Sequence, residues 1–432
     1  MAILGAVASF DTRVIHSRSI QVDASSHCQL ACPSCPTATG ETRAALGAGH
    51  LSLEHFQDLL ERNPELREVE LSNYGEMFLN PRLIDLLRCA HQHKVVLHAD
   101  NGVNLNHASD AALEALVEYR FRSITCSIDG ASAGTYSQYR VKGDFERVMG
   151  HIRKINEYKR KHRSGFPILR WQFIVFGHNE HEIGAARKLA EDMGMGFYTK
   201  LSWDPAFSPI QDRELVQIQA GQRELSREEF YRATGRDYMR GICHQLWRAP
   251  VLNWDGRVTG CCRNFWGDFG ANAFEEGLAE SLNSESMQHA RQMLMGRAGE
   301  RADLPCITCD LYQAMKRDGT WLTEEEIRPK DNNESILISV VPEPTSPAVT
   351  DVDILITPGT QVNRTFLEHP PKAPRFTVDS SFSICVTVPA AGDYMIYAFP
   401  KHLDAAFPAV ALPVRVEERP IAQEFRFLIP IP

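Results

Sequence analysis

Three cysteines near the beginning of the chain have the spacing of a metal-binding loop. Cys28, Cys32 and Cys35 follow residues 18–23, a run that is typical of a β-strand. Three thiolates on one loop can bind three irons of a cubane iron-sulfur cluster and leave the fourth iron without a protein ligand. Chemistry on a bound molecule takes place at such an open metal position. A structural zinc site is the alternative, but zinc usually needs four ligands in CxxC pairs, and only His27 lies nearby.

A second group of cysteines can complete the ligand set of another metal centre. Its members form a Cx17Cx44CxxC array of Cys243, Cys261, Cys306 and Cys309. Four thiols suit either an iron-sulfur cluster or a zinc ribbon. A fully ligated cluster cannot bind substrate without losing a thiolate, so its expected role is electron transfer.

One cysteine of the second region has no assigned place in that array. Cys262 directly follows Cys261, and the spacing leaves open which of the two binds the metal. Either Cys262 is a buried structural thiol, or its S–H group faces the substrate and can return a hydrogen atom to a substrate radical. The scattered Cys89, Cys126 and Cys385 are expected to be packing residues.

Strand-like and helical segments alternate through the first half of the chain. Strands are predicted at 18–23, 68–72, 94–99, 123–128, 169–176 and 197–203, and helices at 54–62, 82–92, 110–119, 145–161 and 181–193. Such alternation predicts parallel strands with crossover helices. We therefore expect an α/β fold with a partial (β/α)6 barrel over residues 15–205, whose strand ends position the first cysteine loop.

The remainder of the chain predicts three further segments. Residues 206–241 are polar and are interpreted as a connecting segment, and residues 242–318 as a small domain built around a bound centre. Seven short strand-like runs within 330–432, separated by Pro, Gly and Asp, predict a C-terminal antiparallel β-sandwich. The linker is expected at 329–334.

The first cysteine loop resembles the signature of the radical S-adenosylmethionine (SAM) superfamily. Later strand ends match further motifs of that family, although each alone is typical of an ordinary turn. The resemblance implies that Gly75 and Glu76 receive the methionyl ammonium of SAM, that Asn101, Ser127 and Asp129 lie near its carboxylate and ribose, and that Val175 faces adenine. Ser34 departs from the family, in which the residue before the third cysteine is often aromatic.

The second cysteine group resembles the auxiliary-cluster domains called SPASM and twitch. Five cysteines occur here, and the shorter twitch form with one cluster therefore matches better than the fuller SPASM form. The resemblance implies two [4Fe-4S] clusters in all. In alcohol-oxidising members of the twitch group the substrate alcohol becomes a ketone, whereas resemblance to aminoglycoside epimerases gives Cys262 the role of hydrogen donor.

The radical SAM resemblance implies a reaction and an external electron donor such as flavodoxin or ferredoxin. Reductive cleavage of SAM gives a 5′-deoxyadenosyl radical, which removes a hydrogen atom from an unactivated C–H bond. Substrate is expected at the C-terminal mouth of the strands, as in other barrels. The candidates to contact it are the strand-end residues Tyr74, Arg170, Gln172, Trp203 and Asp204.

Three functions remain open from the sequence. The favoured one is biosynthetic oxidation or epimerisation of a hydroxylated small molecule, namely a sugar, aminocyclitol or nucleoside, because Cys28 leaves little room for a preceding peptide-recognition domain. The second is maturation of a ribosomally made peptide, with the sandwich as docking module. The third is a non-catalytic iron-sulfur or zinc-binding assembly protein, against which the intact cysteine loop and Glu76 argue.

The composition excludes several classes of protein. The chain of 432 residues has 46 Lys and Arg against 55 Asp and Glu, a net charge of −9, and no basic stripe for nucleic acid. The sequence shows no secretory signal. It also has no run of about 18 apolar residues, the length that a membrane-spanning helix needs. We expect the reducing cytoplasm, where clustered cysteines more often bind metal than form disulfides.

Two histidines and two glutamates crowd together after the fifth predicted strand. His178, Glu180, His181 and Glu182 lack the HExxH spacing that puts two metal ligands on one helix face. Asn179 followed by Glu182 instead predicts a capping box that opens the next helix.

Overall fold

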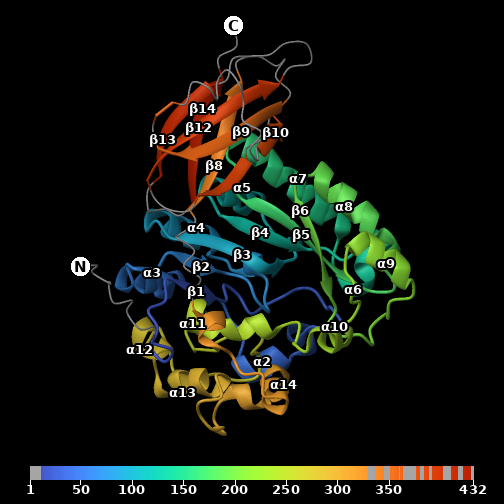
Figure 1. The fold of residues 1–432 in the computed structure, drawn as a ribbon, viewed down its shortest axis with the longest axis vertical. Helices are drawn as coiled ribbons and strands as arrows, with labels where there is room; N and C mark the ends of the chain where they lie inside the picture. Colours follow the sequence, from blue (N-terminus) through green and yellow to red (C-terminus); the bar gives the residue numbers. More distant parts are fainter. Residues whose placement is uncertain are drawn as a thin grey trace, which may run out of the picture.

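The computed structural model describes residues 11–328 continuously and the strands of the C-terminal region. The described stretches there are 336–344, 351–359, 361–362, 376–379, 384–388, 392–401, 410–416 and 422–429. The linker expected at 329–334 lies outside the described residues. Figure 1 shows a central sheet with helices, a second helical segment at residues 240–328 on one side of it, and the C-terminal strands on the other.

A seven-stranded sheet forms the centre of the molecule, with strand order β6-β5-β4-β3-β2-β1-β7. Every neighbouring pair in it is parallel, as the predicted alternation of strands and helices requires. The expected partial barrel is confirmed. Its strands are β1 (Ser19–Val22), β2 (Glu68–Glu70), β3 (Val96–Val103), β4 (Ser123–Ser127), β5 (Ile168–Val175), β6 (Gly196–Leu201) and β7 (Val251–Leu252).

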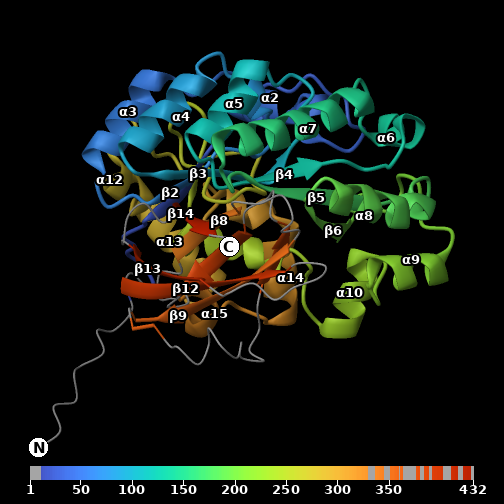
Figure 2. The ribbon, with the colours of Figure 1, turned by 90° about the horizontal axis from the view of Figure 1, so that it is seen from above.

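The crossover helices cover one side of this sheet (Figure 2). They are amphipathic: α3, for example, begins at the N-cap Ser52 and buries Phe56, Leu59 and Leu60. The main crossover helices are α3 (Leu53–Arg62), α4 (Leu83–Gln92), α5 (Asp110–Glu118), α7 (Phe145–His162) and α8 (Ile183–Asp192). Shorter elements are α1 (Pro36–Thr39), α2 (Glu41–Leu46), η1 (Met77–Leu79), α6 (Ala133–Tyr139) and η2 (Glu180–Glu182).

The segment after the sixth strand is helical and leads into the cysteine-rich domain, which was predicted at residues 242–318. Strand β7 of that domain pairs with β1 at the edge of the sheet, so the domain continues the barrel. Arg291 is fully buried there and donates to the carbonyl oxygens of Leu246 (2.9 Å) and Leu282 (2.6 Å). The elements are α9 (Arg213–Ala220), α10 (Arg227–Thr234), η3 (Arg240–His244), α11 (Gln245–Arg248), α12 (Leu278–Leu282), α13 (Glu285–Leu294), η4 (Pro305–Thr308), α14 (Asp310–Asp318) and α15 (Glu324–Ile327).

The C-terminal strands form two sheets, as the sequence predicts. Their orders are β10-β9-β12-β13 and β11-β8-β14, and all pairs are antiparallel except β14 with β8, which is parallel. The expectation of a purely antiparallel sandwich is wrong at that pair. The strands are β8 (Ile336–Pro344), β9 (Asp351–Pro358), β10 (Phe376–Asp379), β11 (Ile384–Val388), β12 (Gly392–Lys401), β13 (Val410–Val416) and β14 (Ala422–Ile429).

The capping box predicted at Asn179 does not form. The Asn179 side chain accepts the backbone N–H of Phe176 at 2.8 Å instead of capping a helix. Glu182 accepts the N–H of Ala131 and the hydroxyl of Ser132, both at 2.6 Å, and thus fixes the loop that leads into α6. The prediction is wrong because Asn179 binds a backbone group that precedes it, and Glu182 binds a loop about 50 positions earlier in the sequence.

Among the described residues, no helix has the length and apolar character needed to cross a bilayer.

Candidate active site and auxiliary metal centre

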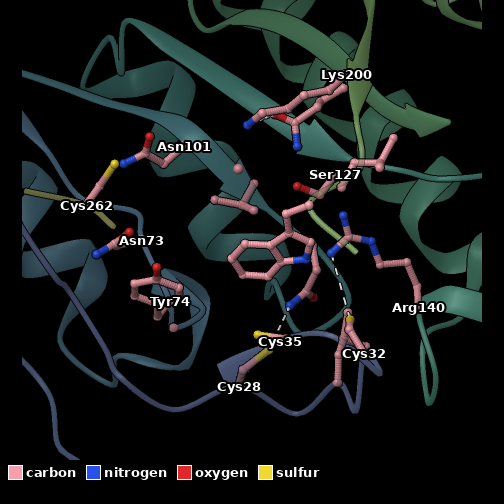
Figure 3. Close-up of a pocket in the computed structure, with 18 of the residues that line it drawn as sticks. Cys28, Cys32, Cys35, Asn73, Tyr74, Asn101, Ser127, Arg140, Lys200 and Cys262 are labelled. Carbon is pink, nitrogen blue, oxygen red and sulfur yellow. Dashed lines mark hydrogen bonds between the residues drawn. The ribbon is translucent and has the colours of Figure 1, made fainter. Parts of the chain in front are cut away.

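A cavity of about 310 Å³ lies at the C-terminal ends of the parallel strands. This is where barrels place their active sites. Most of the residues singled out in the sequence line it together (Figure 3), namely Cys28, Cys32, Cys35, Tyr74, Gly75, Glu76, Asn101, Ser127, Gln172, Trp203 and Cys262. Side chains from α10, from η3 and from the cysteine-rich domain close the other wall.

The first cysteine loop runs from β1 to α1 at one end of this cavity. Burial raises the pKa of Cys28 to about 12 and also raises that of Cys32. Asn104 Nδ2 donates to Cys28 Sγ at 3.6 Å, and Arg140 Nη1 donates to Cys32 Sγ at 3.8 Å. The three cysteines are free thiols. Soft donors with polar partners fit an iron-sulfur cluster, whose iron would replace the thiol protons.

Gly75 and Glu76 are held against the cysteine loop by close backbone packing. A Cβ atom on Gly75 would lie 1.6 Å from the carbonyl oxygen of Ser25, so only glycine permits this approach. The buried carboxylate of Glu76 accepts the backbone N–H groups of Asn104 (2.6 Å) and Phe78 (3.3 Å). Burial nevertheless raises the pKa of Glu76 to about 7. A bound ammonium group would therefore stabilise its ionised form.

The ends of β3 and β4 meet at the floor of the cavity. Gly102 has φ +119°, and a Cβ atom there would lie 2.4 Å from the Ser127 hydroxyl oxygen. Asn101 donates from Nδ2 to Gln21 Oε1 (3.0 Å) and to the Ser72 carbonyl (3.2 Å). The two predicted cofactor contacts Asn101 and Ser127 are thus fixed by neighbouring strands.

Asp129 and Val175, which were predicted to contact the cofactor, do not line the cavity themselves. Asp129 is fully buried and accepts from Arg140 Nε and from the Ile174 N–H, both at 2.7 Å. It therefore positions Arg140, which does line the cavity. Val175 lies in the core, whereas its neighbour Ile174 lines the cavity, because successive strand side chains point to opposite faces.

Two of the predicted substrate contacts also lie outside the cavity lining. Arg170 pairs with Asp100 (Nη1–Oδ1, 2.9 Å) further along the strands. Asp204 accepts the hydroxyl of Ser34 at 2.6 Å, at the position where the resembling family often has an aromatic residue. The charged lining residues that the sequence did not indicate are Arg140, Lys200, Arg227 and Arg263. Lys200 is the last residue but one of β6, so the strand-end pattern could have indicated it.

The four cysteines of the second array surround one small cavity. Cys243, Cys261, Cys306 and Cys309 come from η3, from the loop after β7 and from both ends of η4. Burial raises the pKa of each, and the neighbouring thiols raise the pKa values of Cys243 and Cys306 further. Apolar residues, among them Leu294 and Phe269, complete the lining. Such convergent, desolvated thiols fit a fully ligated metal centre.

Cys262 belongs to the other cavity. Cys261 lines the small cavity with the remaining three thiols, whereas Cys262 lines the large one. The N–H of Cys262 donates to Gln245 Oε1 at 2.8 Å, which fixes the turn. Burial raises the pKa of Cys262 to about 12, so it carries an S–H group at neutral pH. Figure 3 shows its sulfur pointing toward Asn101, inside the cavity.

Comparison with known protein families matches residues 243–310 to SPASM, described as an iron-sulfur cluster-binding domain. The match contains all five cysteines of the second region. The expected resemblance of this segment to SPASM domains is thereby confirmed. The matched family is SPASM, whereas the number of cysteines favours the twitch form.

Solved structures resemble this chain at low sequence identity. SuiB of Streptococcus suis bound to S-adenosylmethionine is 14% identical, with a TM-score of 0.50, and the likeness covers 70% of this chain and 72% of that one. SuiB bound to precursor peptide SuiA is 12% identical, covers 70% and 71%, and has a TM-score of 0.49. BtrN in complex with AdoMet and 2-DOIA is 13% identical, covers 65% and 87%, and has a TM-score of 0.38. No curated protein sequence matches.

Proposed function

We propose that this protein is a radical SAM enzyme that epimerises a carbon centre of a hydroxylated small molecule, such as a sugar or nucleoside. The observation that carries the proposal is the separation of Cys261 from Cys262, because it leaves a protonated thiol in the cavity that holds the first cysteine loop. The likeness to SAM-bound SuiB supports SAM as the cofactor.

Different residues of the cavity would bind the cluster and the charged groups of SAM. Cys28, Cys32 and Cys35 would hold a [4Fe-4S] cluster, Glu76 the ammonium of SAM, and Arg140 its carboxylate. A reduced cluster bound by these cysteines would supply the electron that cleaves SAM to a 5′-deoxyadenosyl radical. The enclosing walls exclude water and hold one C–H bond of the substrate close to that radical.

Cys262 then completes the exchange of hydrogen at carbon. With SAM bound and cleaved, the substrate carbon would lose a hydrogen atom to the cofactor, and the Cys262 S–H bond would break to give a hydrogen atom to the other face of that carbon. The resulting thiyl radical needs one electron and one proton to become a thiol again. An external donor of the flavodoxin or ferredoxin class supplies the electron, and solvent supplies the proton.

Oxidation to a ketone is the second candidate, and one contact favours it. Arg263 lines both cavities, and its carbonyl oxygen accepts the Tyr74 hydroxyl at 3.0 Å. Arg263 thus belongs to the walls of both cavities. A metal centre held by the four cysteines would supply an acceptor for one electron of a substrate radical, which would become a ketone after also losing one proton.

The two reactions are distinguished by a Cys262→Ala variant in D2O. Because the thiol exchanges with solvent, wild-type enzyme places one non-exchangeable deuterium in the product, measured by mass spectrometry. The variant is expected to cleave SAM at a similar rate and to give no deuterated epimer. Cys126→Ala, a buried thiol outside the cavity, serves as the control. An unchanged deuterated product from Cys262→Ala would contradict the role of this thiol.

A further inference from the structure

Four cationic side chains line the large cavity, and two of them already have a carboxylate partner. Arg140 pairs with Asp129 at 2.7 Å, and Arg263 Nε pairs with Asp310 Oδ1 at 3.0 Å. Both of these cations therefore have a counterion within the chain. The other two cations are Lys200 and Arg227, whose surroundings differ.

Lys200 and Arg227 have only neutral partners. Lys200 Nζ donates to Gln172 Oε1 at 3.3 Å, and Arg227 Nη2 donates to the Leu201 carbonyl at 3.4 Å. The Arg227 guanidinium lies over the Tyr238 ring at 5.4 Å, and its buried Nε has no hydrogen-bond partner. Neither cation forms an ion pair with a carboxylate in the part of the chain that the structure describes.

The two cations also lie close enough to repel each other. Burial lowers the pKa of Lys200, and the charge of Arg227 also lowers it, whereas the nearby Cys262 opposes this effect. Burial likewise lowers the pKa of Arg227, and the nearby Arg263 adds to this effect, whereas Tyr238, Asp237 and Asp310 oppose it. Holding two desolvated cations together without a counterion is unfavourable. Lys200 and Arg227 thus place two cations without a carboxylate partner in one cavity of a chain whose net charge is −9.

Their position separates them from the cysteine loop. Lys200 lies near the end of β6 and Arg227 begins α10, whereas the cluster cysteines follow β1. Figure 3 shows Lys200 at the end of the cavity opposite Cys28 and Cys32. Arg140, which donates to the Cys32 sulfur, is closer to the place of a cofactor bound at that loop. The Lys200 end is therefore left for the substrate.

We infer that Lys200 and Arg227 bind a phosphate ester of the substrate. A phosphate monoester or diphosphate carries about two negative charges, which matches two unpaired cations, and Arg and Lys are both common phosphate ligands. The inference rests on the proposed function only in assigning this end of the cavity to the substrate. It narrows the substrate to a phosphorylated or nucleotide-linked sugar and excludes a free aminocyclitol, whose ammonium groups the same cations would repel.

The test measures anion binding directly and does not need turnover. Cluster-loaded protein saturated with SAM is titrated anaerobically with glucose 1-phosphate, inorganic phosphate and glucose by calorimetry. We expect both phosphates to bind and glucose not to bind. Lys200→Met and Arg227→Met should each weaken phosphate binding at least about tenfold, whereas Lys200→Arg should stay within about threefold. Lys188→Met, which removes the exposed partner of Asp192, is the control.

Two results would overturn the inference. One is phosphate binding that is absent, or unchanged in both Met variants. The other is a loss of SAM affinity in Lys200→Met with phosphate affinity unchanged, which would assign this lysine to the cofactor. If phosphate binds as expected but SAM is not cleaved, the proposed function fails and the anion site stands.

Discussion

Arg140 lies between the predicted strand-end motif at Asp129 and the cavity. The sequence pattern places Asp129 at the cofactor, but the structure buries it beneath Arg140, which donates to Cys32. Burial raises the pKa of Asp129, and the Arg140 charge opposes that effect. The motif could be found from the sequence because it ends a strand. The intervening arginine could not, because its position depends on how α6 packs over the strand ends.

Replacing Asp129 should therefore affect both stability and cofactor binding. Breaking a buried ion pair leaves an unpaired charge, so Asp129→Asn is expected to lower the free energy of unfolding by about 3–5 kcal/mol. SAM affinity should fall as Arg140 loses its orientation. Urea denaturation and calorimetric titration with SAM measure the two effects.

The control for Asp129→Asn is Asp192→Asn, which breaks an exposed i,i+4 pair with Lys188. That change should cost no more than about 0.5 kcal/mol. Equal losses of stability in the two variants, with SAM affinity unchanged, would show that Asp129 does not position Arg140.

At the scale of elements, β2 and β3 enclose an ion network that the sequence did not indicate. His98 Nδ1 lies 2.9 Å from Glu70 Oε2 and 3.1 Å from Asp100 Oδ2. Burial lowers the pKa of His98, but these carboxylates outweigh it and raise the value to about 9. Although burial raises the pKa of Asp100, hydrogen bonding and the charge of His98 bring it to about 2.

This network predicts a specific dependence of stability on pH. Because the folded-state pKa of His98 is raised from 6.5 to about 9, its contribution is complete below pH 6.5 and is lost as pH rises through 9. We expect His98→Gln to cost roughly 2–3 kcal/mol at pH 6 and much less at pH 9.5. Denaturant unfolding at the two pH values measures this.

His107→Gln, at an exposed position, provides the matched control and should change little at either pH. A cost of His98→Gln that is the same at pH 6 and pH 9.5 would show that His98 is neutral in the folded protein.

The barrel strands and the long helices were predictable from the sequence, whereas two short elements were not. Each of the six barrel strands combines β-branched residues with a turn signal, and the long helices have apolar residues at helical spacing. Helix α6 was missed because it has only seven residues and includes Gly134. Strand β7 was missed because its two residues pair with β1 across more than 200 positions of sequence.

At the scale of the whole molecule, the cysteines line two cavities. The first cysteine loop lines the large cavity, and the four cysteines of the second array line the small one. The consecutive residues Cys261 and Cys262 separate, since Cys261 lines the small cavity and Cys262 the large one. The spacing in the sequence left that division open, since both residues stand in one turn. Strands β9 and β12 have a separate apolar cluster of Leu355, Met395, Tyr397 and Phe399. No described residue of the C-terminal strands lines either cavity.

Formation of 5′-deoxyadenosine from SAM is the measurement that tests the central claim most directly. Anaerobically reconstituted protein with about eight irons per chain, reduced in the presence of SAM, is expected to release 5′-deoxyadenosine and methionine. The Cys28/Cys32/Cys35 triple-Ala variant should release neither, yet retain about four irons in the SPASM domain. Absence of 5′-deoxyadenosine from fully loaded wild-type protein would contradict the account.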